Sequence, residues 1–460
     1  MNSITQTMKS GLTKGSVTRN LLVISSPITM GMLFRSVRDL VDLMWIGRIS
    51  SEAVAAVAIF LTIHWMAVVL NEIIGISSLS LVSQLFGAKD RKQTQLVIEQ
   101  TIAFKAFLGI IAALPLLVAL EPLVSFFTDD AEVLKLALEY GYIRIISLPL
   151  LFALASINTV LRSVGNASLS MFILFLAAFI NLILDPILMF ESVPGLEIPG
   201  LNLGVFGAAL ATVISTIVSF LVGCYLLLSG KAKAKMSFRG LFQLNWEIDK
   251  KLVTIGLPSG ISIFFIHFFN LLVLKLVSVY GTGAVAAMGI GKVINDFVTI
   301  PLMGLVLGGT SIVGQSLGAK QLDQIKKTIT TACIHGSVLM MLATFVVYLF
   351  PETIIKFFTN DSQVIVISVT MLLITMPGLV FLGVSSGLKP AFYGAGFNLP
   401  FLTSSIISLW LVQLPFLLVV IYLFDWGLNA VWFSFILAQF VEMLVFLFLY
   451  WKGAWKTNQI

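Results

Sequence analysis

The 460-residue chain is 58% hydrophobic and only 11% charged, whereas a soluble globular domain carries about 25% charged residues. It has too few charged side chains to solvate a surface of its size, which excludes an ordinary cytosolic enzyme. The net charge of +6 does not indicate a nucleic-acid partner, because the basic residues lie in short loops between apolar segments and not on one soluble face.

Apolar segments of roughly 20 residues or more, long enough to cross a hydrocarbon layer of ~30 Å, number about twelve. They begin near residues 20, 53, 94, 131, 168, 204, 248, 284, 325, 364, 398 and 428. Uniformly apolar runs of this length are typical of transmembrane helices, since barrel strands alternate. The sequence therefore predicts an all-α protein that spans the lipid bilayer about twelve times.

The distribution of basic residues predicts the orientation. Most of them fall in alternate loops, including the long basic stretch at 231–251, and the side that carries an excess of Lys and Arg is normally cytoplasmic. An even number of spans then places both termini in the cytoplasm. The first segment is preceded by polar residues and interrupted by Arg35 and Arg38, so we expect no cleaved signal peptide.

The chain contains an internal repeat with one constant offset. Pro27 maps to Pro258, and the same offset relates Gly87–Lys89 to Gly318–Lys320, Asp130 to Asp361, and Gly165 to Gly396. A register that persists through polar loops indicates duplication. Because six segments separate equivalent points, the two halves enter the membrane from the same side.

This arrangement predicts two parallel six-helix lobes related by a pseudo-two-fold axis along the membrane normal. We expect an N-terminal lobe at 1–230, a cytoplasmic basic linker at 231–247 and a C-terminal lobe at 248–460. The substrate path is expected between the lobes.

Four charges fall inside the first segment, where each costs about 2.5 to 3.5 kcal/mol by insertion scales. Arg35 and Asp39, and likewise Arg38 and Asp42, are spaced i,i+4, which places each pair side by side on a helix. The simplest interpretation is two structural ion pairs. Asp42 has a second interpretation, because another acid can be placed at its depth.

That second acid is Asp185 of the fifth segment, which also lies shortly before the outer end of its helix. Asn181 lies one turn deeper on the same helix face. Two carboxyl groups and an amide in a poorly hydrated cavity can be neutralised by protons or by a hard cation such as sodium. Either event changes which helix packing is stable, as an ion-coupled switch requires.

Pro27 precedes Asp42 in the same segment. Proline removes a backbone hydrogen bond and kinks a helix, so a change at Asp42 could bend the helix near Pro27. A static kink is the alternative. The repeat partner Pro258 makes the proline a feature of the fold in either case.

The pattern as a whole resembles the multidrug and toxic compound extrusion (MATE) transporters. The resemblance rests on Pro27 and Asp42 in the first helix, on the segment Asn181–Pro186 in the fifth, and on the loops at 84–89 and 315–320. It is most similar to the branch related to DNA-damage-inducible protein F. The other coupling mode, through acids in the seventh and tenth helices, is not expected, because these helices offer His267 and Lys275 and no acid, respectively.

The resemblance implies that Asp42, Asn181 and Asp185 hold the coupling proton or cation, and that Tyr140 and Thr212 join their hydrogen-bond network. No cofactor is implied besides the coupling ion. No metal ligand set is certain; if that ion is sodium, Asp42, Asn181, Asp185 and Thr212 would bind it. No residue is assigned to substrate binding.

The implied function is that of a multidrug efflux antiporter and not of an enzyme. It would export amphipathic or cationic organic compounds by alternating access, driven by inward flow of protons or sodium, across a prokaryotic inner membrane and as a monomer. Differential affinity of substrate and ion for the two conformations would drive the cycle.

Two alternatives remain open. A flippase for lipid-linked oligosaccharides would need cavity cations such as Arg35, Arg38 and Lys275 to hold a pyrophosphate. An intramembrane enzyme would need a catalytic pair, for which Ser385 and His335 are the only suggestion; small residues in helices more often indicate close packing.

Overall fold

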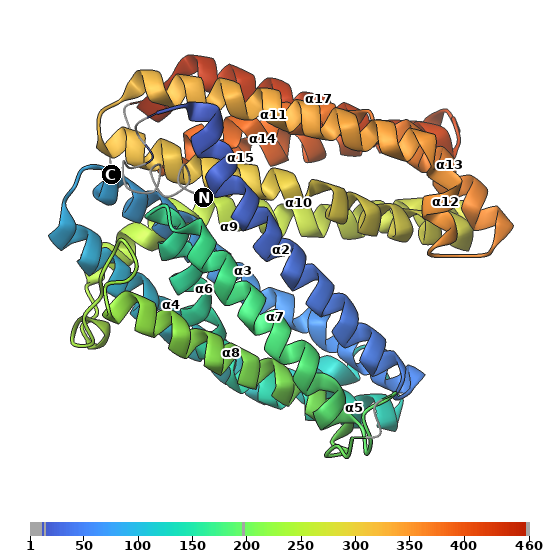
Figure 1. The fold of residues 1–460 in the computed structure, drawn as a ribbon. Helices are drawn as coiled ribbons and strands as arrows, with labels where there is room; N and C mark the ends of the chain where they lie inside the picture. Colours follow the sequence, from blue (N-terminus) through green and yellow to red (C-terminus); the bar gives the residue numbers. More distant parts are fainter. Residues whose placement is uncertain (1–11, 13–14, 196–197, 457–460) are drawn as a thin grey trace. The chain divides into compact units, whose positions relative to one another are not determined.

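The structure, a computed structural model, describes residues 12, 15–195 and 198–456. Within these ranges the chain is helical, and the only extended pairing is a single β-bridge between Ser192 and Pro199. Ten helices are long and apolar enough to cross a membrane, or up to 12 spans if each of two bent helix pairs is one. This confirms the predicted all-α membrane fold (Figure 1). Most of the predicted cytoplasmic termini, residues 1–11 and 457–460, lie outside the described residues.

The chain forms two compact units. The N-terminal unit comprises residues 30–86 and 90–256; the C-terminal unit comprises the described residues up to 29, residues 87–89, and those from 257 on. The N-terminal unit contains the later turns of α2 (Val17–Gly47), then α3 (Ser51–Gly87), α4 (Arg91–Ser125), α5 (Ala131–Ile146), α6 (Leu148–Ser163), α7 (Ala167–Met189), α8 (Gly204–Leu228), η1 (Gly240–Phe242) and the first turns of α9 (Trp246–Val277).

The C-terminal unit continues from α9. Two stretches of π-helix, η3 (Ile406–Gln413) and η4 (Val419–Leu423), lie within the candidate membrane span Leu399–Leu423. Its remaining elements are η2 (Ser278–Tyr280), α10 (Thr282–Gly318), α11 (Leu322–Leu349), α12 (Pro351–Lys356), α13 (Ser362–Thr375), α14 (Gly378–Ala395), α15 (Leu399–Ser405), η3 (Ile406–Gln413), α16 (Leu414–Leu418), η4 (Val419–Leu423), α17 (Leu428–Lys452) and η5 (Ala454–Lys456).

The compact units divide the chain beside the two repeated prolines. Helix α2 changes unit after Thr29, two residues beyond Pro27, and α9 changes unit after Gly256, two residues before Pro258. The C-terminal unit therefore includes the first turns of α2, and the N-terminal unit includes the first turns of α9. The lobe boundaries given above follow the sequence repeat and stay a prediction.

Equivalent positions in the two halves adopt the same local geometry. Lys89 and Lys320 both have a left-handed backbone, with φ of 63° and 58°, which is uncommon for a residue other than glycine. Asp130 caps α5 and Asp361 caps α13, each by accepting two backbone N–H groups. The helix pairs that follow these caps bend by 52° and 49°. This agreement supports the duplication at the level of backbone geometry.

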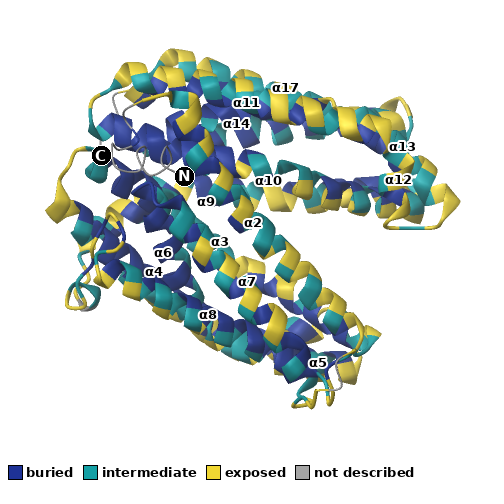
Figure 2. Cartoon of the chain, viewed as in Figure 1, coloured by how far each residue is buried: buried dark blue, intermediate teal, exposed yellow. Residues whose placement is uncertain are grey.

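The surface of the long helices suits a lipid environment. On α7, Ile173, Ala177, Asn181 and Asp185 share a buried face, whereas Phe172, Phe175 and Phe179 on the opposite face are 47%, 41% and 49% exposed. Figure 2 shows exposed residues along the helices as well as at their ends. Such a surface would be an aggregation liability in water and is expected in a bilayer.

The predicted linker is held by hydrogen bonds to the N-terminal part of α4. Glu99 is 5% exposed, and its Oε1 accepts hydrogen bonds from the backbone N–H of Ser237 at 2.6 Å and from Nε2 of Gln95 at 2.8 Å. The fully buried Gln100 accepts from the backbone N–H of Asn245 at 2.7 Å and donates to the carbonyl oxygen of Gln243. The linker therefore has a defined path over the N-terminal unit.

Candidate functional site

Helices α2 and α7 bring Asp42 and Asp185 together inside the N-terminal unit. The two carboxyl groups are close enough to form a side-chain hydrogen bond. Asp185 is fully buried and Asp42 is half-buried. The two acids come to the same level because each lies near the C-terminal end of its helix, and the two helices run in the same direction. A hydrogen bond between two carboxyl groups requires a proton on one of them.

Asn181 connects this acid pair to α8. Its Nδ2 donates to Oδ1 of Asp185 at 3.0 Å and to Oγ1 of Thr212 at 3.4 Å. The hydroxyl of Thr212 in turn donates to the carbonyl oxygen of Ala208 at 3.2 Å. The i,i+4 spacing of Asn181 and Asp185 on α7 permits the first contact.

Three oxygen atoms of this cluster are buried without a hydrogen-bond partner: Oδ1 of Asp42, Oδ2 of Asp185 and Oδ1 of Asn181. An unsatisfied buried acceptor costs about 1 to 3 kcal/mol, so three in one place create a demand for protons or for a cation. Carboxylate and amide oxygens are ligands that hard cations prefer. The residues present therefore fit either a proton or a sodium ion.

Tyr140 borders the acid pair from α5. Its ring is 4% exposed and packs edge-to-face on Phe60 of α3, with 5.3 Å between ring centroids. It lies within electrostatic range of Asp42. All five residues assigned to the coupling site by resemblance thus lie in one unit, on four helices.

The arginines of α2 pair differently from the prediction. Nη2 of Arg38 lies 2.6 Å from Oδ1 of the adjacent Asp39, and Nε of Arg35 lies 3.9 Å from Oδ2 of the same residue. The predicted Arg38–Asp42 ion pair is therefore wrong. The long arginine side chain reaches its neighbour Asp39, whereas Asp42 is directed at Asp185 of α7. Asp39 consequently serves both arginines, and Asp42 keeps no ion-pair partner in the described part of the chain.

Two further titratable residues, which the sequence analysis did not assign to the site, contact Tyr140 and its neighbour Phe60. Arg144 lies one turn beyond Tyr140 on α5, with its guanidinium carbon 5.8 Å from the tyrosine ring centroid, and it is within electrostatic range of both acids. His64 of α3 is buried against Phe60, with 5.6 Å between ring centroids. The i,i+4 spacing places Arg144 beside Tyr140, but spacing within α5 does not show that it lies near the acids.

The proposed serine–histidine pair is not formed. The hydroxyl of Ser385 donates to the carbonyl oxygen of Leu382 at 3.1 Å, and Nδ1 of His335 contacts the carbonyl oxygen of Thr331 at 2.7 Å, so each bonds its own helix. Gly383 and Gly336 instead pack α14 against α11 at backbone contact distance. The small residues serve close packing, as in other transmembrane helices.

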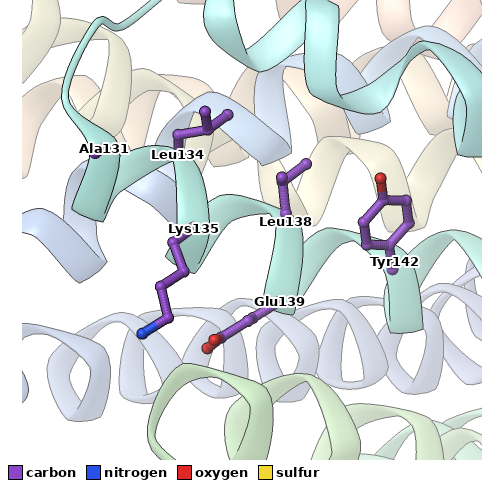
Figure 3. A pocket seen from close by; sticks show the side chains of 6 residues that line it. All are labelled: Ala131, Leu134, Lys135, Leu138, Glu139 and Tyr142. Atoms are coloured by element: carbon purple, nitrogen blue, oxygen red, sulfur yellow. The ribbon is translucent and has the colours of Figure 1, made fainter.

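One surface pocket lies on the exposed side of α5 (Figure 3). It contains none of the predicted site residues; its lining is Ala131, Leu134, Lys135, Leu138, Glu139 and Tyr142. It is therefore unrelated to the buried acid pair.

A duplicated helical membrane fold with a buried acid pair between helices is typical of secondary transporters. The MatE family model matches residues 27–187 and again residues 258–419, one match in each half. The chain therefore belongs to the MatE family. The two matches begin 231 residues apart, which agrees with the offset of the sequence repeat.

Relatives and solved structures agree with this assignment. The chain is 27% identical to the probable multidrug resistance protein YoeA of Bacillus subtilis, covering 97% of this chain and 96% of that one. It is 24% identical to the probable multidrug resistance protein NorM of Thermotoga maritima, covering 96% and 94%. A solved outward-facing multidrug resistance MATE family transporter shares the fold, with a TM-score of 0.88, 22% identity and coverage of 97% and 98%.

A MOP superfamily transporter from Pyrococcus furiosus gives the same values: a TM-score of 0.88, 22% identity and coverage of 97% and 98%. At this identity the solved structures establish the shared two-lobe fold only. The more specific likeness to the branch related to DNA-damage-inducible protein F stays a prediction.

Proposed function

We propose that the protein is a secondary active multidrug exporter that moves amphipathic or cationic organic compounds out of the cell by alternating access, coupled to inward flow of protons or sodium. Membership of the MatE family and likeness to multidrug resistance proteins support the class of function. In this proposal the protein lies in the cell membrane as a monomer with both termini cytoplasmic.

The observation that carries the proposal is the cluster of three unpartnered oxygens at Asp42, Asp185 and Asn181. Such a cluster is unfavourable unless positive charge or a proton reaches it. Binding the coupling ion therefore stabilises the packing of α2 against α7, and losing it weakens that packing. An ion that prefers one packing can drive a conformational cycle, since a ligand shifts an equilibrium only through its differential affinity.

Helix α2 is the element through which this change would act. It carries Asp42 near its end and Pro27 in its interior, beside the point where it passes from one compact unit to the other. The proline leaves one backbone hydrogen bond unformed, which lowers the cost of bending there. We propose that neutralising Asp42 changes the bend of α2 near Pro27.

The charges of α2 favour export of drug-like compounds over lipid-linked oligosaccharide flipping. A pyrophosphate needs cations that are available to bind it. Arg35 and Arg38 both engage the carboxylate of Asp39. An acid pair with unpartnered oxygens instead favours cationic ligands in its surroundings.

The test is transport by the purified protein in proteoliposomes loaded with an organic cation such as ethidium. A pH gradient and a sodium gradient are imposed separately, each at constant membrane potential. Export driven by at least one gradient is expected. No export under either gradient, together with accumulation of lipid-linked sugar in a deletion strain, would favour the flippase.

A further inference from the structure

The acid pair has a positively charged neighbour that the proposed coupling scheme does not use. Arg144 lies within electrostatic range of both Asp42 and Asp185. Its side chain is half-buried, and its Nε is enclosed without a hydrogen-bond partner. Among the described residues no carboxylate forms an ion pair with it.

The other cations of α2 near the pair already have a carboxylate partner. Arg38 and Arg35 share the carboxylate of Asp39, at 2.6 Å and 3.9 Å. Arg144 is thus the cation within electrostatic range of both acids that has no ion-pair partner among the described residues. In surroundings of low polarity, a unit charge close to an ion-binding site changes the binding free energy of the ion considerably.

Tyr140 holds the arginine in this place. Both residues lie on α5 one turn apart, and the guanidinium carbon is 5.8 Å from the ring centroid of Tyr140, at the range of a cation–π contact. The ring itself is fixed by edge-to-face packing on Phe60. The arginine therefore lies within electrostatic range of two acids that each have an unpartnered oxygen, and its own Nε is an unpartnered donor.

We propose that Arg144 is a built-in counter-cation of the acid pair that weakens sodium binding there and so sets which coupling ion the site accepts. The inference rests on the proposed function, because it assumes that the acid pair is the coupling site. A guanidinium beside the pair repels an incoming alkali cation. It also offers the free acceptor oxygens an alternative partner when no ion is bound.

The test measures sodium binding without any drug. The thermal unfolding midpoint of the detergent-solubilised protein is followed as NaCl replaces choline chloride at constant ionic strength, because an ion that binds the folded state raises the midpoint. Arg144→Gln is expected to reach half of the shift at an at least about tenfold lower sodium concentration than the wild type. Arg144→Lys, which keeps the charge, is expected to resemble the wild type.

Two controls locate the effect. Lys135→Gln removes an exposed cation from the same helix and should leave sodium binding unchanged. The double variant Asp42→Asn with Arg144→Gln should lose the gain in sodium affinity. If Arg144→Gln does not accumulate as folded protein, Arg144→Met, which keeps an unbranched apolar side chain, replaces it.

Equal sodium affinity in the wild type and the neutral Arg144 variant would overturn the proposal, as would a gain that persists in the double variant. Absence of sodium binding in both proteins would overturn it too. The proposed exporter function fails by a separate result, namely no export of ethidium by the wild-type protein under either ion gradient.

Discussion

Asn181 donates a hydrogen bond from Nδ2 to Oδ1 of Asp185, 3.0 Å away and one turn further along α7. The same nitrogen lies 3.4 Å from Oγ1 of Thr212 on α8, so the amide group links the acid to a second helix. This use of the nitrogen fixes the opposite orientation of the amide oxygen, which is left buried without a partner. Asn181 thus contributes both rigidity and one of the acceptor oxygens of the site.

Replacing Asp42 by asparagine is expected to abolish ion-driven export and leave the protein folded and inserted. The amide has the shape of the acid and cannot change charge, so the packing of α2 no longer depends on the ion. Asp185→Asn is expected to impair export as well. Initial rates of ethidium export in vesicles measure both effects. Glu139→Gln, on the exposed side of α5, is the matched control. Full transport by Asp42→Asn would remove this acid from the mechanism.

Removing the amide of Asn181 is expected to destabilise the N-terminal unit. Asn181→Leu leaves Oδ1 of Asp185 without its donor inside the protein, at a cost of about 1 to 3 kcal/mol. Thr212→Val removes only the longer contact and should cost less. Thermal unfolding midpoints in detergent show which of the two variants is less stable. An equal or higher midpoint for Asn181→Leu would contradict the role of this hydrogen bond.

Substituting Pro27 by alanine is expected to slow transport and to leave drug affinity unchanged. Alanine restores the missing backbone hydrogen bond and makes α2 harder to bend. The comparison needs the export rate at saturating substrate and, separately, the equilibrium dissociation constant of the drug. Pro115→Ala, inside α4, provides a proline control outside the proposed hinge. Unchanged export by Pro27→Ala would show that the proline is a static feature.

Removing the carboxylate of Glu99 is expected to release the linker from α4. Glu99→Ala deletes the acceptor of the Ser237 N–H group at 2.6 Å, a charge-assisted hydrogen bond of about 1.5 to 3 kcal/mol. Limited trypsin digestion should then cleave after Lys233 or Lys235 about tenfold faster, because local opening becomes more frequent. Glu132→Ala, which removes a different acid, is the control for a general effect of losing a carboxylate on the cleavage rate. Cleavage at the wild-type rate would mean that the linker is held by other contacts.

The helices were predictable because length and apolarity decide them. The predicted starts near 131, 204 and 428 fall at the first residue of α5, α8 and α17. The bend after Ile146 was missed, because the apolar residues on both sides predict one span, although Ser147 and Pro149 mark the start of a second helix. The attachment of the linker was also missed, because Glu99 and Gln100 reach Ser237 and Asn245 only in the folded chain.

The candidate site was partly predictable. Depth along each helix was enough to place Asp42 beside Asp185, and helical spacing placed Asn181 next to Asp185. Pairing rules failed for Arg38, because i,i+4 spacing permits a contact without selecting it over the adjacent Asp39. Arg144 was missed because its relation to the acids depends on how α5 packs, which spacing within one helix does not show.

The left-handed lysines at 89 and 320 bear on the history of the chain. A backbone conformation that lysine seldom adopts stands at the same place in both copies, as expected if it predates the duplication. Asp42, in contrast, is not repeated in the second half. The position that corresponds to Asp42 under the same offset is Val273, buried among apolar side chains. The ancestral scaffold was inherited twice, whereas the chemistry of the first copy has no counterpart at that position in the second.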